Sequence, residues 1–93
     1  MSKIILQGHI IVPKDELPHV QAALPKHIEL TQQETGCLVF KVTQDLENNE
    51  QFNVYEEFSD RKSFESHQDR VKSSNWGQVT ARVERHYTIT ESP

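Results

Sequence analysis

Apolar side chains recur along this 93-residue chain with two spacings, every second residue or every third to fourth residue. Residues 3–12 are rich in Ile, Leu and Val and predict a strand. This strand should end at Pro13, because proline has no N–H to donate to a neighbouring strand. Its apolar side chains fall on both faces, so we expect both faces to be covered, one of them by helices.

Helical spacing follows Pro13 and predicts the first helix. Asp15 is suited to cap its N-terminus, and Pro18 falls in the first turn, where a missing N–H costs little. Pro25 lies inside this helix and should kink it or shift its start. Gly36 suits the left-handed residue that ends a helix. The residues expected to face the core are Val20, Ala23, Leu24, His27, Ile28 and Thr31.

Strand alternation returns in residues 37–43 and 52–58, which predict a hairpin joined by the polar turn at 45–50. The residues expected on one face of these two segments are Leu38, Phe40 and Val42 in the first, and Phe52, Val54, Glu56 and Phe58 in the second.

A second helix should begin after Ser59 or Asp60, either of which can cap it. Its apolar stripe consists of Phe64, His67 and Val71. A short helix around Trp76 and a final strand over residues 83–90 complete the chain. The resulting order, β-α-β-β-α-β, is the ferredoxin-like plan, an α+β fold with an antiparallel sheet, and it occupies one domain spanning residues 1–93.

Composition adds an expectation about assembly and location. Only 34% of the residues are hydrophobic, which limits the core of so small a chain, and we therefore expect a homodimer. The net charge of −4 comes without a basic cluster, which argues against nucleic acid and against an anionic membrane surface as partners. The N-terminal apolar run is too short for a signal peptide or a membrane span, so we expect a soluble, cytoplasmic protein.

Glu56 stands at an apolar position of its strand, between Val54 and Phe58. Burial of a charged carboxylate is costly unless the group is paired or hydrogen-bonded, and desolvation raises its pKa. Glu56 could therefore act as a general base or orient a histidine. The structural alternative is that it accepts hydrogen bonds from a backbone turn or from an arginine such as Arg82 or Arg85.

His27 and His67 interrupt the apolar stripes of the two long helices. The ferredoxin-like plan places both helices on one face of the sheet, so the two imidazoles can converge there. Histidine is the side chain best suited to proton transfer near neutral pH. The alternative is a pair of partly buried, hydrogen-bonded histidines that fix the position of the helices.

Three further residues are candidates for substrate binding, namely Tyr55, Trp76 and His9. The rings of Trp76, Tyr55 and Tyr87 could line the pocket of an aromatic ligand, although Trp76 is equally suited to anchor a core or a dimer. His9 and His86 lie on strands that we expect to be neighbours, but they lack a ligand spacing or a cysteine pair, so we predict no metal site. Cys37 is expected to be a small buried hydrophobe and not a nucleophile.

Familiar catalytic motifs are absent from the sequence. It has no G-x-S-x-G, P-loop, G-x-G-x-x-G or H-E-x-x-H motif, which argues against serine hydrolase, nucleotide-dependent and zinc-protease chemistry.

The chain resembles the antibiotic biosynthesis monooxygenase family, through His27, E-T-G-C-L at 34–38, F-N-V-Y-E-E-F at 52–58, Asp60, Phe64 and His67. This resemblance implies that two ferredoxin-like chains form a dimeric α+β barrel.

The family that the chain resembles includes cofactor-free oxygenases of quinols and polycyclic phenols, haem-degrading oxygenases, and an isomerase of a phosphorylated autoinducer-2 sugar. Gly8 stands where the haem degraders carry an asparagine, and Trp76 lies too far past Phe58 to match their tryptophan, which argues against haem cleavage.

The resemblance therefore implies a monooxygenase that needs no cofactor and acts on a quinol or polycyclic phenol with O₂. In this interpretation His27 or His67 is the base and Glu56 orients it. The alternatives are an isomerase of a phosphorylated carbonyl compound, for which no basic cluster marks a phosphate site, and a non-catalytic dimer that binds a small molecule.

Overall fold

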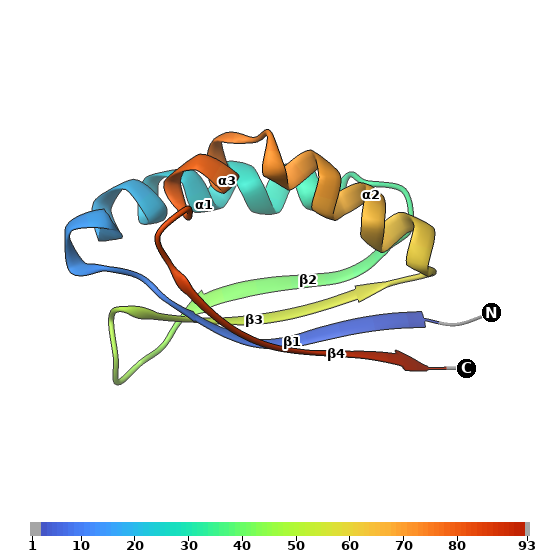
Figure 1. Ribbon diagram of the computed structural model, residues 1–93, viewed down its shortest axis with the longest axis horizontal. Helices are drawn as coiled ribbons and strands as arrows, with labels where there is room; N and C mark the ends of the chain where they lie inside the picture. Colours follow the sequence, from blue (N-terminus) through green and yellow to red (C-terminus); the bar gives the residue numbers. More distant parts are fainter. Residues whose placement is uncertain (1–2, 93) are drawn as a thin grey trace.

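The computed structural model describes residues 3–92 as one four-stranded antiparallel sheet with its helices on one face (Figure 1). The elements are β1 (Lys3–Ile11), the short 3-10 helix η1 (Lys14–Glu16), α1 (Leu17–Gln32), β2 (Cys37–Gln44), β3 (Gln51–Phe58), α2 (Arg61–Lys72), α3 (Asn75–Val79) and β4 (Glu84–Ser92). The strands lie in the order β2-β3-β1-β4. The predicted α+β, ferredoxin-like order is confirmed, with α3 as the short extra helix around Trp76.

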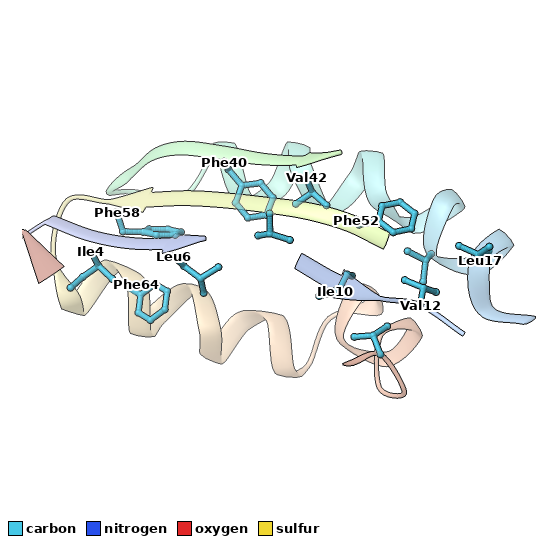
Figure 2. Close-up of a cluster of buried hydrophobic side chains, with 13 residues drawn as sticks. Ile4, Leu6, Ile10, Val12, Leu17, Phe40, Val42, Phe52, Phe58 and Phe64 are labelled. Atoms are coloured by element: carbon cyan, nitrogen blue, oxygen red, sulfur yellow. The ribbon is translucent and has the colours of Figure 1, made fainter. Parts of the chain in front are cut away.

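The core lies between the sheet and the helices, and Figure 2 shows its side chains directed into this layer. Alternation along β1 places Ile4, Leu6 and Ile10 on the helix side, where each is almost completely buried. Phe58 and Phe64 meet there edge to face, with ring centroids 5.8 Å apart. The other buried apolar side chains of the cluster are Val12, Leu17, Val20, Phe40, Val42, Phe52, Val54 and Val83.

The opposite face of the sheet carries a mixture of apolar and polar side chains. Ile5 and Ile11 of β1 point to this face and are half-buried, and Val39 of β2 lies on it as well. No helix among residues 3–92 covers this face, as Figure 1 shows. The expectation that both faces of β1 are covered is therefore met on only one side within a single chain.

The start of α1 differs from the prediction. The chain forms η1 before α1, so Glu16 occupies the cap position, without a side-chain hydrogen bond to the helix. Asp15 instead pairs with Arg82, 3.2 Å away. Pro18 lies in the first turn as predicted, and α1 continues through Pro25 with its start unaffected by that residue.

A bulge in β2 corrects the predicted alternation of the hairpin. The register shifts between Cys37 and Val39, which leaves Leu38 54% exposed, while Phe40 and Val42 are buried as expected. After the hairpin, the Asp60 side chain accepts a hydrogen bond from the backbone N–H of Ser63, and this cap starts α2 as predicted. Gly36, in the turn before β2, has a φ of 88°.

Gly8 allows β1 and β4 to approach each other closely. Its φ is +150°, and a Cβ atom at this position would lie 1.9 Å from the carbonyl oxygen of His86 on β4. Any other residue would therefore meet the backbone of the neighbouring strand as well as adopt an unfavourable conformation.

We expect Gly8→Ala to lower the free energy of unfolding by about 2 kcal/mol or more, through the clash with the β4 backbone and the strained φ. Urea denaturation followed by circular dichroism measures this loss. Glu65→Ala, on the exposed side of α2, is the control and should change the midpoint little. Equal midpoints for Gly8→Ala and the wild type would contradict the close approach.

Candidate active site

Glu56, His27 and His67 line one cavity of about 60 Å³ between the helices and the sheet. Alternation along β3 directs Glu56 to the helix side, and helical spacing brings His27 from α1 and His67 from α2 to the same layer. All three residues are at least 93% buried, with exposed fractions of 5% for His27, 7% for Glu56 and 3% for His67. The remaining lining residues are Leu6, Ile10, Gln68, Val71, Trp76, Thr80, Val83, Arg85 and Tyr87.

His67 lies between two carboxylates. Its Nδ1 atom is 2.7 Å from Oε1 of Glu34, and its Nε2 atom is 3.8 Å from Oε1 of Glu56. Because an ionised carboxylate accepts hydrogen bonds but cannot donate them, the short contact requires a proton on Nδ1. The Nε2 atom therefore faces Glu56. Burial lowers the pKa of His67, and the hydrogen bond to Glu34 opposes this shift.

Glu34 was not among the predicted site residues, although it belongs to the segment that carries the family resemblance. It lies in the turn between α1 and β2, where carboxylates are usually solvated. Here Nη2 of Arg70 is 3.2 Å from Oε1 of Glu34 and also donates to Oγ1 of Thr31 at 3.0 Å. Only the tertiary fold brings α2 against this turn, so no local sequence pattern identifies the contact.

His27 is held by rings on several sides. It stacks on Trp76 with ring centroids 4.6 Å apart and an interplanar angle of 4°, and meets Phe40 edge to face at 5.2 Å. Burial, followed by the charges of His67 and Arg70, lowers the pKa of His27 to about 3. Its buried Nδ1 atom has no hydrogen-bond partner among the described residues. His27 is therefore a neutral imidazole with an unused polar atom at neutral pH.

Glu56 is the group with the most unusual environment. Burial raises its pKa to about 7, and the negative charge of Glu34 adds to the rise. Its buried Oε1 atom has no hydrogen-bond partner within residues 3–92. Neither arginine considered from the sequence pairs with Glu56 among the described residues: Arg82 pairs with Glu16 at 2.9 Å, and Arg85, although it lines the same cavity, donates to the carbonyl of Thr80 at 3.1 Å. Glu56 can therefore take up or release a proton near neutral pH.

Two residues of β4, Arg85 and Tyr87, also line the cavity. Tyr87 was among the aromatic residues considered for a ligand pocket, whereas Arg85 was considered only as a partner of Glu56. They stand opposite Ile10 and Gly8 of β1 and therefore share the helix side of the sheet. Burial, followed by the charge of Glu56, raises the pKa of Tyr87 to about 12, which keeps its hydroxyl protonated. The alternation of β4 could have indicated Arg85 as well, because it falls on the same side of the predicted final strand as Tyr87 and Ile89.

Of the three candidates for substrate binding, Trp76 lines the cavity, whereas Tyr55 and His9 lie on the opposite face of the sheet. The Tyr55 hydroxyl donates to the Glu57 carboxylate on that face. His9 stacks on His86 of β4 with ring centroids 4.8 Å apart, so these two strands are neighbours, as expected. Within this chain, neither Tyr55 nor His9 reaches the cavity.

Three other features of the described residues concern metal ions, Cys37 and membranes. Residues 3–92 contain no group of three or more His, Cys, Asp or Glu side chains placed to hold a metal ion. Cys37 is half-buried, and burial followed by the charges of Glu34 and Glu56 raises the pKa of its thiol, which disfavours the nucleophilic thiolate. None of the described helices has the length and apolar character needed to span a membrane.

We expect Glu56→Gln to stabilise the protein increasingly as the pH rises. The pKa of Glu56 is raised from 4.5 to about 7 in the folded state, so the wild type loses stability between these pH values, because the unfolded chain releases this proton while the folded protein keeps it. The loss approaches about 3 kcal/mol above pH 7, and the variant avoids it. Urea denaturation of both proteins at pH 5 and pH 8 measures this difference. A variant that is less stable than the wild type at pH 8 would contradict the unpaired state of Glu56.

Comparisons with known proteins place the chain in a family. The sequence profile described as "Antibiotic biosynthesis monooxygenase" matches residues 3–78. No protein with a curated description matches the chain.

Solved structures share the fold at low sequence identity. A proposed antibiotic biosynthesis monooxygenase from Nitrosomonas europaea superposes with a TM-score of 0.76 at 19% identity, covering 100% of this chain and 97% of its own. A conserved protein of unknown function from Bacteroides thetaiotaomicron, described as a possible oxidoreductase, has a TM-score of 0.76 at 16% identity, with 97% of each chain covered. A conserved protein from Methanosarcina mazei has a TM-score of 0.69 at 21% identity, covering 98% of this chain and 90% of its own. At these identities the structures support the fold alone. Because the sequence profile matches most of the chain, the chain belongs to the antibiotic biosynthesis monooxygenase family.

Proposed function

We propose that this protein is a cofactor-independent monooxygenase that oxidises a quinol or polycyclic phenol with O₂. The observation that carries the proposal is the buried, unpaired carboxyl group of Glu56, which faces a cavity shared with His27 and His67. Membership of a family that includes monooxygenases supports the reaction class. An electron-rich phenolate can reduce O₂ directly, so the protein needs only a base, a sheltered cavity and a hydrogen bond for the developing anion.

In this proposal Glu56 is the general base, in place of the histidines considered from the sequence. A base works best when its pKa lies near the operating pH, and the pKa of Glu56 is about 7 while that of His27 is about 3. Neutral His27 can hydrogen-bond the substrate oxygen through its unused Nδ1 atom. The Tyr87 hydroxyl, protonated at neutral pH, can donate a second hydrogen bond.

The proposed reaction begins when Glu56 takes the proton of the substrate hydroxyl. The resulting phenolate gives electrons to O₂, and a C–O bond forms at a ring carbon that carries hydrogen. The peroxide then takes up the stored proton, the O–O bond breaks, and the hydrogen of that carbon leaves as a proton with the departing hydroxide. The products are a quinone and one water molecule, and the electrons come entirely from the substrate.

The size of the cavity limits how the substrate can bind. A volume of about 60 Å³ accommodates the hydroxyl-bearing edge of an aromatic molecule but not a whole polycycle. Tyr87 and Ile89 follow each other on the helix side of β4 and are 36% and 49% exposed. We propose that the remaining rings lie along these two side chains.

A second candidate function is isomerisation of a phosphorylated carbonyl compound. Arg85 favours this function, because its guanidinium lines the cavity and can bind the phosphate group of such a substrate. The sequence alone shows no basic cluster for a phosphate. Proton transfer by Glu56 would serve this reaction too, without consumption of O₂. A purely non-catalytic binding role is less well supported, because it requires Glu56 and the histidines to be satisfied by protein partners, and both Glu56 and His27 have an unpaired buried atom.

We expect O₂ uptake with at least one member of a panel of quinols and polycyclic phenols, and we expect Glu56→Gln to lower kcat by about 100-fold or more. The rate should rise with pH through about 7, because the base must be ionised to accept a proton. An oxygen electrode measures both effects.

Glu65→Gln, on the exposed side of α2, is the matched control and should retain the activity of the wild type. Full O₂ uptake by Glu56→Gln would exclude Glu56 as the base. Turnover of a phosphorylated carbonyl compound without O₂ consumption would favour the isomerase.

We also propose that the protein is a homodimer in which the uncovered face of the sheet meets a second copy. Half-buried Ile5 and Ile11 on this face resemble the margin of a core more than an ordinary solvent surface. A small chain with limited apolar content gains most from such burial. The cytoplasmic location and the absence of nucleic-acid and membrane partners remain predictions from composition.

We expect the wild type to elute as a dimer in size-exclusion chromatography with light scattering, and Ile5→Lys to elute as a monomer, because a buried unpaired charge would oppose association. Leu46→Lys is the matched control, since Leu46 is fully exposed in the turn between β2 and β3. A monomeric wild type at micromolar concentration would refute the proposed interface.

A further inference from the structure

We propose that Glu34 is a positioning residue that fixes His67 so that its Nε2 atom can hold the proton taken from the substrate by Glu56. This inference rests on the proposed function and extends it to a residue outside the cavity lining. It is carried by the row of three groups in which Nδ1 of His67 is 2.7 Å from Glu34 and Nε2 is 3.8 Å from Glu56.

The contact with Glu34 determines which nitrogen of His67 is free. Because the Glu34 carboxylate can only accept a hydrogen bond, Nδ1 must carry the proton, and Nε2 of the neutral ring keeps a lone pair. This lone pair faces Glu56 at 3.8 Å, too far for a hydrogen bond. When Glu56 is ionised, its carboxylate and Nε2 of His67 are therefore both acceptors and cannot hydrogen-bond to each other. A proton added to either group would allow the two to approach to hydrogen-bonding distance.

The charges of the cluster favour uptake of one proton. With Glu56 ionised and His67 neutral, the negative charges of Glu34 and Glu56 are opposed only by Arg70, which lies 3.2 Å from Glu34. One proton on Glu56 or on His67 brings the sum of these four groups to zero. A buried cluster with no net charge avoids the cost of an unpaired ion.

Other titratable groups surround this cluster, and none of them supplies the missing charge directly. His27 of α1 is neutral because burial lowers its pKa to about 3, and Tyr87 of β4 stays protonated because burial raises its pKa to about 12. Burial raises the pKa of Cys37 at the start of β2. Arg85 of β4 is a cation that lines the same cavity, but it donates to the carbonyl of Thr80 at 3.1 Å and forms no ion pair with Glu56 among the described residues. The proton from the substrate is thus the charge that completes the cluster.

The proton transfers involve no other bond. The hydroxyl proton of the substrate moves to Glu56, and from Glu56 to Nε2 of His67, which becomes an imidazolium between two carboxylates. It returns by the same path when the peroxide needs a proton and water leaves. Nδ1 keeps its own proton throughout, so His67 ends each cycle in the tautomer in which it began. Glu34 makes this return possible by preventing the opposite tautomer.

A purely structural role for Glu34 would consist of tying α2 to the turn before β2. In that case its negative charge would have no effect on proton transfer. Glu34→Gln separates the two roles, since glutamine keeps the size of the side chain and one acceptor oxygen but removes the charge. Glu65→Gln removes a charge two residues from His67 on the exposed side of α2 and serves as the control.

The first test uses the wild type alone. Nitrogen-15 NMR of the histidine side chains at pH 8 should show His67 as the Nδ1–H tautomer, with a far-downfield proton signal from its hydrogen bond to Glu34. A predominant Nε2–H tautomer would overturn the inference. This result is independent of any substrate, so it stands apart from the outcome of the O₂-uptake screen, whose failure would count against the proposed function.

The second test is kinetic. We expect Glu34→Gln to lower kcat by about 100-fold with little change in KM. This loss in kcat is smaller than the roughly 10,000-fold loss when the orienting aspartate of a serine protease triad is replaced by asparagine. The smaller loss is expected because Glu56, and not His67, receives the proton first. The pH at which activity is half-maximal should also move down, because the charge of Glu34 raises the pKa of Glu56. A Glu34→Gln enzyme with the kcat and pH profile of Glu65→Gln would overturn the inference.

Discussion

The site depends on the way this fold tolerates one buried carboxyl group. Along β3, Glu56 takes a position in the core-facing row that otherwise holds Phe52, Val54 and Phe58. A cation paired with it would keep the group ionised, but Arg82 and Arg85, the two candidates considered from the sequence, hydrogen-bond to other groups. The structure therefore leaves the desolvation cost uncompensated, and the pKa of Glu56 rises until the group can hold its proton near neutral pH.

The second carboxylate of the cluster, Glu34, differs from Glu56 because it contacts a cation. Glu34 lies at the edge of the same layer, with its side chain 18% exposed, and it contacts both Arg70 and His67. One imidazole is therefore flanked by a carboxylate with a cationic neighbour and by a carboxylate without one. Two like groups in unlike environments are suited to separate roles in acid–base chemistry, one as an electrostatic support and the other as a proton acceptor.

Periodicity was enough to predict the fold and the convergence of Glu56, His27 and His67 on one cavity. Glu56 was recognisable because it breaks a period of two, and His27 and His67 because they break helical stripes, while the ferredoxin-like order places both helices on the same face of the sheet. Strict alternation also places Tyr55, the neighbour of Glu56, on the other face, an argument that could have been made from the sequence.

The sequence did not indicate some features of the structure, because tertiary contacts there outweigh the local preferences of the chain. Glu34 occupies a polar turn, and only the docking of α2 gives it a buried partner. Leu38 leaves the core because of a bulge, which shifts the register without a glycine to mark it. Asp15 loses its predicted capping role because the chain first forms η1 and directs this side chain toward Arg82.

The two faces of the sheet thus contribute differently to the stability of the protein. On the helix side, Glu56, His27 and His67 occupy positions where apolar side chains would stabilise the core, and the unpaired atoms of Glu56 and His27 oppose folding. A chain of 93 residues has little stability in reserve for such a site. Burial of the other face against a second copy would offset this loss without adding any group to the cavity. The proposed dimer would in this way compensate for the polar groups that occupy part of a small core.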